Sequence, residues 1–276
     1  MTYDYGARVY DARIGRGLIL DPSTKKYPNL LPYNAFENNP IYFKDTNGKD
    51  AEYTIDDKSN TINITATIII TGQNATVAKA KDMQKQIMNK FCGDHPFTDK
   101  DGNTYNMKFT ITVKTVESLH SDYKPKPSDN FVRLMDKDPS NDPSFVAANG
   151  WSGEWDENPK QATFAHETGH LLGLADRYWY VSYDNNLNRG EQFENVPNTD
   201  INDLMGLQAS ANPLKAKVTQ EDINALGNYI IKNQKDGKGI IRGKGAPLNK
   251  PTEADKSAIK NQHGGEVKID PRKKKE

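Results

Sequence analysis

The strongest hydrophobic pattern of the chain lies between residues 60 and 116. Residues 60–73 hold a β-branched, apolar run, which is typical of a central strand. Residues 76–91 place their apolar side chains broadly on one side of a helix. Residues 103–116 alternate apolar and polar side chains, which predicts a second strand. We therefore expect a strand, a helix and another strand in succession.

Shorter elements are predicted in the second half of the chain. Residues 130–135 and 144–148 are two further strand candidates. Asn158 and Pro159 are typical of a helix N-cap and first turn, so we expect a helix to begin there. Residues 218–232 predict a last helix, because a threonine suited to the N-cap precedes acidic residues in the first turn.

The remaining stretches are polar. Residues 181–204 predict a long loop that could shape a substrate pocket. The chain from 235 to 276 is rich in Lys, Gly and Pro and ends in a basic run, which favours a solvated, disordered tail. The mean hydropathy of −0.85 agrees with extensive loops or a tail.

Charge and cysteine content restrict the class of protein. The chain has 37 basic and 37 acidic residues, so nothing indicates a bulk attraction to nucleic acid or to an anionic membrane, and neither is expected as a partner. No apolar run approaches the ~20 residues that span a bilayer, and the N-terminus lacks a signal-peptide pattern. Cys92 is the only cysteine, which excludes an intrachain disulfide.

The most informative segment is residues 166–176, with the sequence H-E-T-G-H-L-L-G-L-A-D. On a helix, His166 and His170 lie one turn apart on the same face, so both imidazoles can reach one metal ion. Glu167 follows the first histidine and can reach a water molecule at that metal. A catalytic zinc needs three protein ligands and an open position for this water.

Asp176 is the candidate third ligand. A straight helix would carry it about 9 Å beyond the second histidine, but Gly173 can end the helix and turn the chain back. Alternatives remain open from the residues alone. Asp176 could pair with Arg177 or cap a turn, and Glu191 or Glu194 could be the ligand instead.

With Met205 downstream in N-D-L-M-G, the motif resembles the metzincin clan of zinc endopeptidases. Its Asp-ending form is similar to snapalysin and to the immune-inhibitor-A type peptidases. The resemblance implies that His166, His170 and Asp176 bind Zn²⁺. It also implies that Glu167 is the general base and that Met205 lies in a turn beneath the metal. Met205 as an ordinary core residue is the alternative interpretation.

Further roles follow from the same resemblance. Several metzincins carry a tyrosine two residues after the methionine, where this chain has Leu207. A tyrosine that stabilises the oxyanion must therefore come from elsewhere, such as Tyr178, Tyr180 or Tyr183. In metzincin-like proteases the strand just before the active helix is a sheet edge that pairs with the substrate, which here points to residues 144–152.

The residues that we expect to contact substrate are Ala148, Gly150, Trp151 and Tyr178. Trp151 and Trp155 fit a role as core aromatic residues equally well. The implied fold is α+β: a mixed twisted sheet of about four to five strands, packed on a backing helix and an active-site helix, plus a C-terminal helix. This metallopeptidase domain would span residues 49–234, followed by the tail 235–276.

Residues 1–48 resemble a different family. They contain Y-D-Y-G-A-R-V-Y-D, then G-R, D-P, Y-P-N-L-L-P-Y-N and N-N-P, the pattern of the Rhs repeat-associated core. In that family the segment closes a large shell of YD repeats and precedes a variable C-terminal toxin. A generic run of aromatic hairpins would not require this spacing.

Together the two resemblances imply a zinc endopeptidase that acts as the C-terminal toxin of an Rhs-type polymorphic protein. Its partners would be a protein or peptide substrate and a cognate immunity protein, and it would be secreted or delivered as part of the larger exported protein. The alternatives are a non-catalytic Rhs-linked binding or surface module with a structural metal, and a metal hydrolase acting on a non-peptide bond.

Overall fold

The structure is a computed structural model in which the chain forms two compact units, Met1–Asn47 and Gly48–Glu276. It describes residues 2–4, 9–11, 16–17, 51–116, 126, 128–136, 144–147, 150–159, 162–183, 191–207, 212–241, 248–263 and 267–270. In the first unit, β1 (Thr2–Asp4), β2 (Val9–Asp11) and β3 (Arg16–Gly17) form an antiparallel sheet. The rest of the Rhs-like segment lies outside the described residues.

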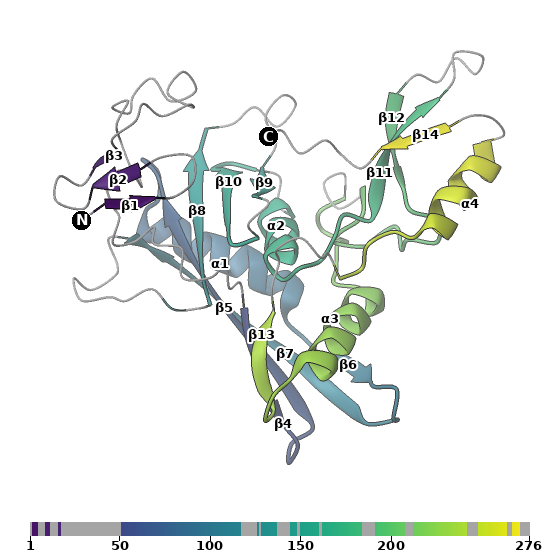
Figure 1. Ribbon diagram of the computed structural model, residues 1–276, viewed down its shortest axis with the longest axis horizontal. Helices are drawn as coiled ribbons and strands as arrows, with labels where there is room; N and C mark the ends of the chain where they lie inside the picture. Colours follow the sequence, from purple (N-terminus) through teal and green to yellow (C-terminus); the bar gives the residue numbers. More distant parts are fainter. Residues whose placement is uncertain are drawn as a thin grey trace. The chain divides into compact units, whose positions relative to one another are not determined.

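The second unit is built on an eight-stranded mixed sheet (Figure 1). Its central strand is β5 (Thr61–Thr71), which pairs in parallel with β7 (Thr104–Thr115) along one edge. Along the other edge, β4 (Ala51–Asp56) pairs antiparallel with the first half of β5, and β8 (Asp129–Met135) pairs in parallel with the second half. The long strand thereby joins two branches of the sheet.

Four short strands extend these branches. They are β6 (His95–Thr98) beside β7, β13 (Lys238–Ile241) beside β4, β10 (Ser152–Asp156) beside β8, and β9 (Phe145–Val146) beside β10. The predicted α+β class is confirmed, whereas the predicted four to five strands are too few. Of the strands that were not predicted, β6, β10 and β13 are short and give little periodic signal. β4 was overlooked although its sequence A-E-Y-T-I-D alternates more and less buried positions.

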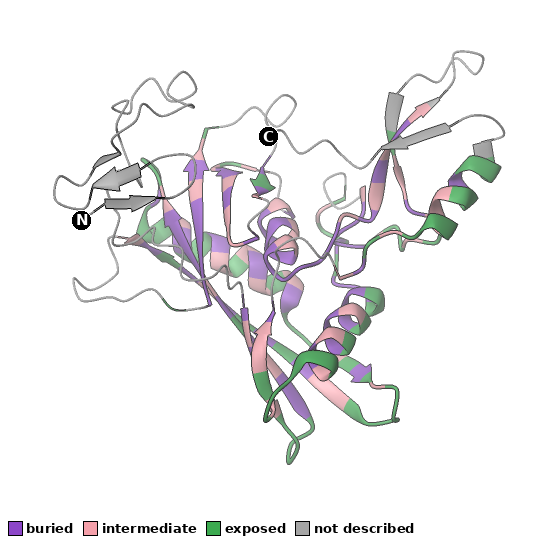
Figure 2. Cartoon of the chain, in the orientation of Figure 1, coloured by how far each residue is buried: buried purple, intermediate pink, exposed green. Residues whose placement is uncertain are grey.

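Helix α1 (Val77–Phe91) crosses the sheet (Figure 1) and buries Ala80, Met83, Ile87 and Phe91. It begins after Thr76, whose side chain accepts a hydrogen bond from Lys79 N at 3.2 Å. Helix α2 (Thr163–Leu171) contacts α1 and β9. Buried residues concentrate on β5, β8, β10 and α2 (Figure 2), so the helix with the two motif histidines is itself part of the core.

The predicted start of α2 at Asn158 is wrong. Asn158 N donates to Asp156 Oδ1 at 3.0 Å, so Asn158 and Pro159 belong to the turn that leaves β10. The helix begins at Thr163 after Ala162, which has no side-chain cap. Packing of Phe164 and Ala165 into the core, with exposed fractions of 1% and 0%, takes the place of a cap in fixing this end.

Helix α3 (Gln220–Asn233) begins with the predicted cap. Thr219 and Asp222 form a capping box, in which each side chain accepts from the other residue's backbone N–H. It is not the last helix, because α4 (Glu253–His263) follows. No helix of the described residues is both long and apolar enough to cross a bilayer.

The regions interpreted as loop and tail contain regular structure. β11 (Tyr178–Tyr183) pairs with β12 (Glu191–Asn195) on one side and with β14 (Val267–Asp270) on the other. A small core joins this sheet to α4 and consists of Trp179, Val181, Val196 and Ile259. The expectation of disorder is therefore wrong for β13, α4 and β14, which are regular elements, whereas most residues of α4 are exposed, as expected of a solvated segment.

Candidate metal centre

Helix α2 presents both motif histidines, and the chain turns back directly after it. Gly173 has φ 82°. Its N–H donates to His170 O at 2.9 Å, and Leu174 N donates to Gly169 O at 2.9 Å. These two bonds form a Schellman motif, which favours glycine because its left-handed conformation has no Cβ penalty. The turn brings Asp176 back toward the helix instead of carrying it away along the axis.

The carboxylate of Asp176 lies between the two imidazoles. Asp176 Oδ1 is 3.3 Å from Nε2 of His166 and 3.3 Å from Nε2 of His170. The rings of the two histidines are nearly perpendicular, at 86°, with centroids 4.8 Å apart. Their potential ligand atoms all lie within 4.8 Å of one another, so this group could hold a metal ion.

The spacing fits zinc. Ligand atoms about 2.0–2.1 Å from a tetrahedral zinc lie about 3.3 Å from one another, and the carboxylate oxygen keeps that separation from both nitrogens. Asp176 Oδ1 is also buried without a well-formed hydrogen bond from the described residues. A buried acceptor of this kind is costly unless a cation or donor meets it, and the residues present therefore suit a metal.

Backbone carbonyls orient both rings. His166 Nδ1 lies 2.8 Å from Leu204 O, and His170 Nδ1 lies 2.8 Å from Leu174 O. Because a carbonyl oxygen only accepts, each Nδ1 must carry the proton and donate it. The Nε2 lone pairs are then directed to the third residue, as second-shell hydrogen bonds require of metal-binding histidines.

The charges of the group reinforce one another in the metal-free protein. Burial lowers the pKa of His166, but hydrogen bonding and attraction by Asp176, with a further contribution from Glu167, raise it to about 9. Burial likewise raises the pKa of Asp176, but attraction to His170 and His166 holds it well below its usual range. A proton on the histidine therefore occupies the place that a divalent cation can take over.

Met205 lies in a tight turn directly against α2. Gly206 N donates to Asp203 O at 3.0 Å, and Met205 N donates to Asp203 Oδ1 at 2.8 Å. The Met205 side chain is fully buried, and its sulfur occupies the space that a Cβ on Gly169 would need. The preceding residue supplies the carbonyl that accepts from His166, so this turn both packs beneath the helix and orients a ligand.

Among the described residues, the alternatives for the third ligand do not join the group. Arg177 forms an ion pair with Glu221 at 2.6 Å, whereas Asp176 faces the histidines. Glu194 lies on β12 opposite Trp179 and is absent from the group that the described residues form. The side chain of Glu191 lies outside the described residues.

Glu167 and the tyrosines have different environments. Glu167 is 5% exposed, and its charge acts on His166, so it lies near the cluster. The rings of Tyr178 and Tyr180 pack edge-on against Phe193, with ring centroids 5.8 Å and 5.4 Å from that of Phe193. The side chain of Tyr183 lies outside the described residues. These contacts do not single out one tyrosine as the group that would stabilise an oxyanion.

The expected edge, residues 144–152, contains the edge strand of the sheet. β9 (Phe145–Val146) is the last strand in the sheet order and pairs antiparallel with β10. β10, the strand immediately before α2, lies inside the sheet between β8 and β9. Pairing of this edge with a substrate stays a prediction.

Of the four residues expected to contact substrate, Ala148 lies outside the described residues. Gly150 is buried in this reversal with φ 84°, and its N–H donates to Ala147 O at 2.8 Å. Trp151 is half-buried, and its ring packs edge-on against Phe131 with the ring centroids 6.1 Å apart. Trp155 is fully buried beside Phe164 and is a core residue.

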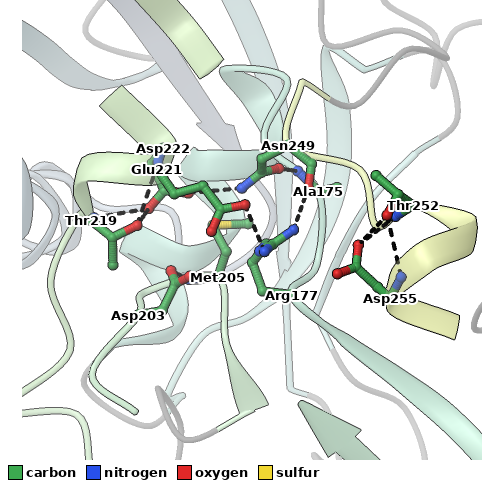
Figure 3. A network of polar contacts seen from close by, with 10 residues as sticks. All are labelled: Ala175, Arg177, Asp203, Met205, Thr219, Glu221, Asp222, Asn249, Thr252 and Asp255. Atoms are coloured by element: carbon green, nitrogen blue, oxygen red, sulfur yellow. Dashed lines mark hydrogen bonds and ion pairs between the residues drawn. The ribbon is translucent and has the colours of Figure 1, made fainter. Parts of the chain in front are cut away.

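A polar network that the sequence did not predict surrounds Arg177 (Figure 3); Arg177, Asp203, Asp222 and Asn249 are buried, whereas the side chain of Glu221 is exposed. It links Arg177, Glu221, Asp222 and Asn249, with Asp203 close by. Asn249 stands in the Lys/Gly/Pro-rich segment, where a single asparagine gives no periodic or motif signal. The first turn of α3 was predicted from its cap, but nothing in the sequence showed which residues its acidic groups would meet.

Comparison of the chain with models of protein families, with curated proteins and with solved structures finds no match. The metal centre is therefore inferred from the residues and geometry of this chain alone.

We predict strong energetic coupling between Gly169 and Met205. Gly169→Ala should improve helix propensity by about 1 kcal/mol, but its Cβ would collide with the Met205 sulfur, so the free energy of unfolding should fall by about 1–3 kcal/mol. In a Met205→Ala background the same change should cost less. A double-mutant cycle by urea unfolding checks this, and additive effects would contradict the packing.

The stability of the metal-free protein should also depend on Asp203. Burial, followed by repulsion from Asp222, raises the pKa of Asp203 to about 7, so the native state keeps a proton that the unfolded chain releases near the ordinary aspartate pKa of 3.8. Stability relative to Asp203→Asn should therefore fall as pH rises from about 4 to 7, by at most about 1.4 kcal/mol per pH unit.

Urea unfolding with a chelator at pH 5, 6 and 7 measures this difference. Asp200→Asn is the matched control, because Asp200 is an exposed carboxyl of the same segment whose pKa is lowered by the Asn202 N–H and by Lys217. Its difference from wild type should be flat over this range. A flat difference for Asp203→Asn as well would disprove the raised pKa.

Proposed function

We propose that residues 48–276 form a zinc-dependent endopeptidase. The observation that carries the proposal is the position of Asp176 Oδ1, 3.3 Å from Nε2 of both His166 and His170. Two imidazoles and a carboxylate are a donor set that zinc accepts, and the separation of the carboxylate oxygen from each nitrogen suits a tetrahedral site. When bound, zinc would polarise a water molecule and the carbonyl of the scissile bond.

The number of ligands favours catalysis over a structural role. Structural zinc sites are closed by four protein ligands, whereas catalytic sites keep one position open. Among the described residues, His166, His170 and Asp176 are the members of the group, with no fourth His, Cys, Asp or Glu. The three side chains are partly exposed, so a water molecule and a substrate can approach them.

Glu167 is the proposed general base. It follows the first ligand on α2, is nearly buried, and lies close enough for its charge to act on His166. In this role its carboxylate accepts a proton from the attacking water and then donates it to the amine of the leaving peptide. The same group thus moves one proton across the reaction, while the neighbouring residues hold its position.

A peptide substrate is favoured by the sheet. β9 ends one branch of the sheet, and α2 contacts it. An extended peptide can add to such an edge through main-chain hydrogen bonds. It would then lie beside the helix that carries His166 and Glu167, which suits a polypeptide better than a small molecule.

The biological setting follows from residues 1–48, which resemble the Rhs repeat-associated core. The chain contacts divide at Asn47 and Gly48, close to the end of that resemblance. We propose that the enzyme is the C-terminal effector of an Rhs-type polymorphic protein, exported with it and directed at proteins of a rival or host cell. A cognate immunity protein would protect the producing cell.

The proposal predicts that Glu167→Gln separates metal binding from catalysis. Because glutamine cannot accept the proton, cleavage of an unfolded protein should fall by about 10²–10⁴-fold, while zinc content should stay at one per chain. Metal analysis and a gel-based cleavage assay on the full chain measure both quantities.

Glu194→Gln provides the control, since Glu194 lies outside the metal group. It should retain both zinc and activity. Cleavage by Glu167→Gln at the wild-type rate would eliminate Glu167 as the base, and loss of zinc in Glu194→Gln would reassign the third ligand.

A further inference from the structure

Asn249 is a buried polar residue whose contacts gather around the third ligand. Its side chain is 6% exposed. Asn249 Oδ1 accepts from Ala175 N at 2.5 Å, and its main-chain oxygen accepts from Arg177 Nη1 at 2.8 Å. One residue earlier, Leu248 N donates to Gly173 O at 2.6 Å. Residues 248–249 therefore bind the chain on both sides of Asp176. Figure 3 shows the contacts of Asn249 with Ala175 and Arg177.

Asp176 needs such support more than the other two ligands. His166 and His170 are held by the hydrogen bonds of α2, whereas residues 174–176 belong to neither a helix nor a strand. A ligand on an irregular segment keeps its geometry only if neighbouring groups fix the backbone. Asn249 supplies this fixation at Ala175, the residue directly before the ligand.

The first turn of α3 anchors Asn249 in turn. Asn249 Nδ2 donates to Asp222 Oδ1 at 2.8 Å, while Asp222 Oδ2 accepts from Thr219 N and Thr219 Oγ1 at 3.0 Å each. The neighbouring Glu221 holds Arg177 Nη2 at 2.6 Å. The capping box of α3 and the segment after Gly173 are thereby linked through one amide side chain.

We propose that Asn249 is a positioning residue of the metal centre, acting through Ala175 and Arg177 on Asp176. The inference rests on the proposed zinc site and adds to it a residue from the C-terminal segment. Asn249 does not touch the metal in this role. It fixes the direction of the carboxylate and so determines zinc affinity, in the way that second-shell residues change metal affinity by about 10–100-fold.

The donor and acceptor pattern allows an exchange test. Asn249→Asp would place a second carboxylate against Asp222 and create repulsion where a hydrogen bond now lies. In Asp222→Asn, the new amide N–H would face another donor, either Asn249 Nδ2 or the donors of Thr219, and one hydrogen bond would be lost. The double variant Asn249→Asp with Asp222→Asn restores one donor and one acceptor and leaves the net charge unchanged.

The full chain and its variants are titrated with zinc against a chromophoric chelator, under conditions where circular dichroism shows every metal-free variant to be folded. Each single variant should bind zinc about 10–100-fold more weakly, and the double variant should recover to within about threefold of wild type. Cobalt substitution provides a second readout, since its visible spectrum should shift in the single variants and return in the double variant.

Thr252→Ala is the matched control for a merely structural effect. Thr252 lies three residues from Asn249 and caps α4: Thr252 Oγ1 donates to Asp255 Oδ2 at 2.8 Å and accepts from Asp255 N at 3.3 Å. It should lower stability in the chelated protein without changing zinc affinity. Single variants that bind zinc as wild type does, or no more weakly than Thr252→Ala, would overturn the inference.

The outcome also separates this inference from the protease proposal. Wild type with one zinc per chain but no cleavage of protein would reject the protease proposal, while the affinities would still decide the role of Asn249. Even if the wild type cleaves no protein, weakened zinc binding in the single variants with recovery in the double variant would support the positioning role of Asn249. Wild type that binds no zinc would reject both.

Discussion

The candidate site depends on keeping one carboxylate oxygen between two imidazoles. Asp176 Oδ1 lies 3.3 Å from both Nε2 atoms, in a region where a buried acceptor needs a cation or a donor to offset the loss of water. Helix geometry alone places the histidines, because residues four apart share a face. The carboxylate has no such help, and the surrounding structure supplies its position through the turn at Gly173 and the polar network around Arg177.

Segments far apart in the chain converge on this arrangement. Leu204 O orients His166, Met205 packs against Gly169, and Asn249 holds the backbone at Ala175. Each contact fixes a different degree of freedom: the rotation of a ring, the depth of the helix, and the path of the chain after it. The proposed chemistry needs all three, because a metal with an open position loses its preferred geometry when one ligand moves.

The sequence predicts those parts that repeat or obey a local rule. The strands β5 and β7 and helix α1 follow from apolar runs, alternation and helical spacing, and the pairing of His166 with His170 follows from a single turn of helix. Asp176 could be predicted as a candidate ligand because Gly173 indicates a reversal of the chain. The role of Asn249 could not be predicted, since it comes from tertiary contacts. The start of α2 was misplaced for a related reason: packing of Phe164 decides it, against the local preference of Asn158 and Pro159.

The central claim is that His166, His170 and Asp176 bind a zinc ion with an open coordination position. Zinc-edge X-ray absorption on the full chain tests it most directly. The account predicts one zinc per chain, coordinated by two imidazole nitrogens and by oxygen at about 2.0–2.1 Å, with an altered spectrum in Asp176→Ala. A chain that binds no zinc, or an unchanged spectrum in Asp176→Ala, would contradict it.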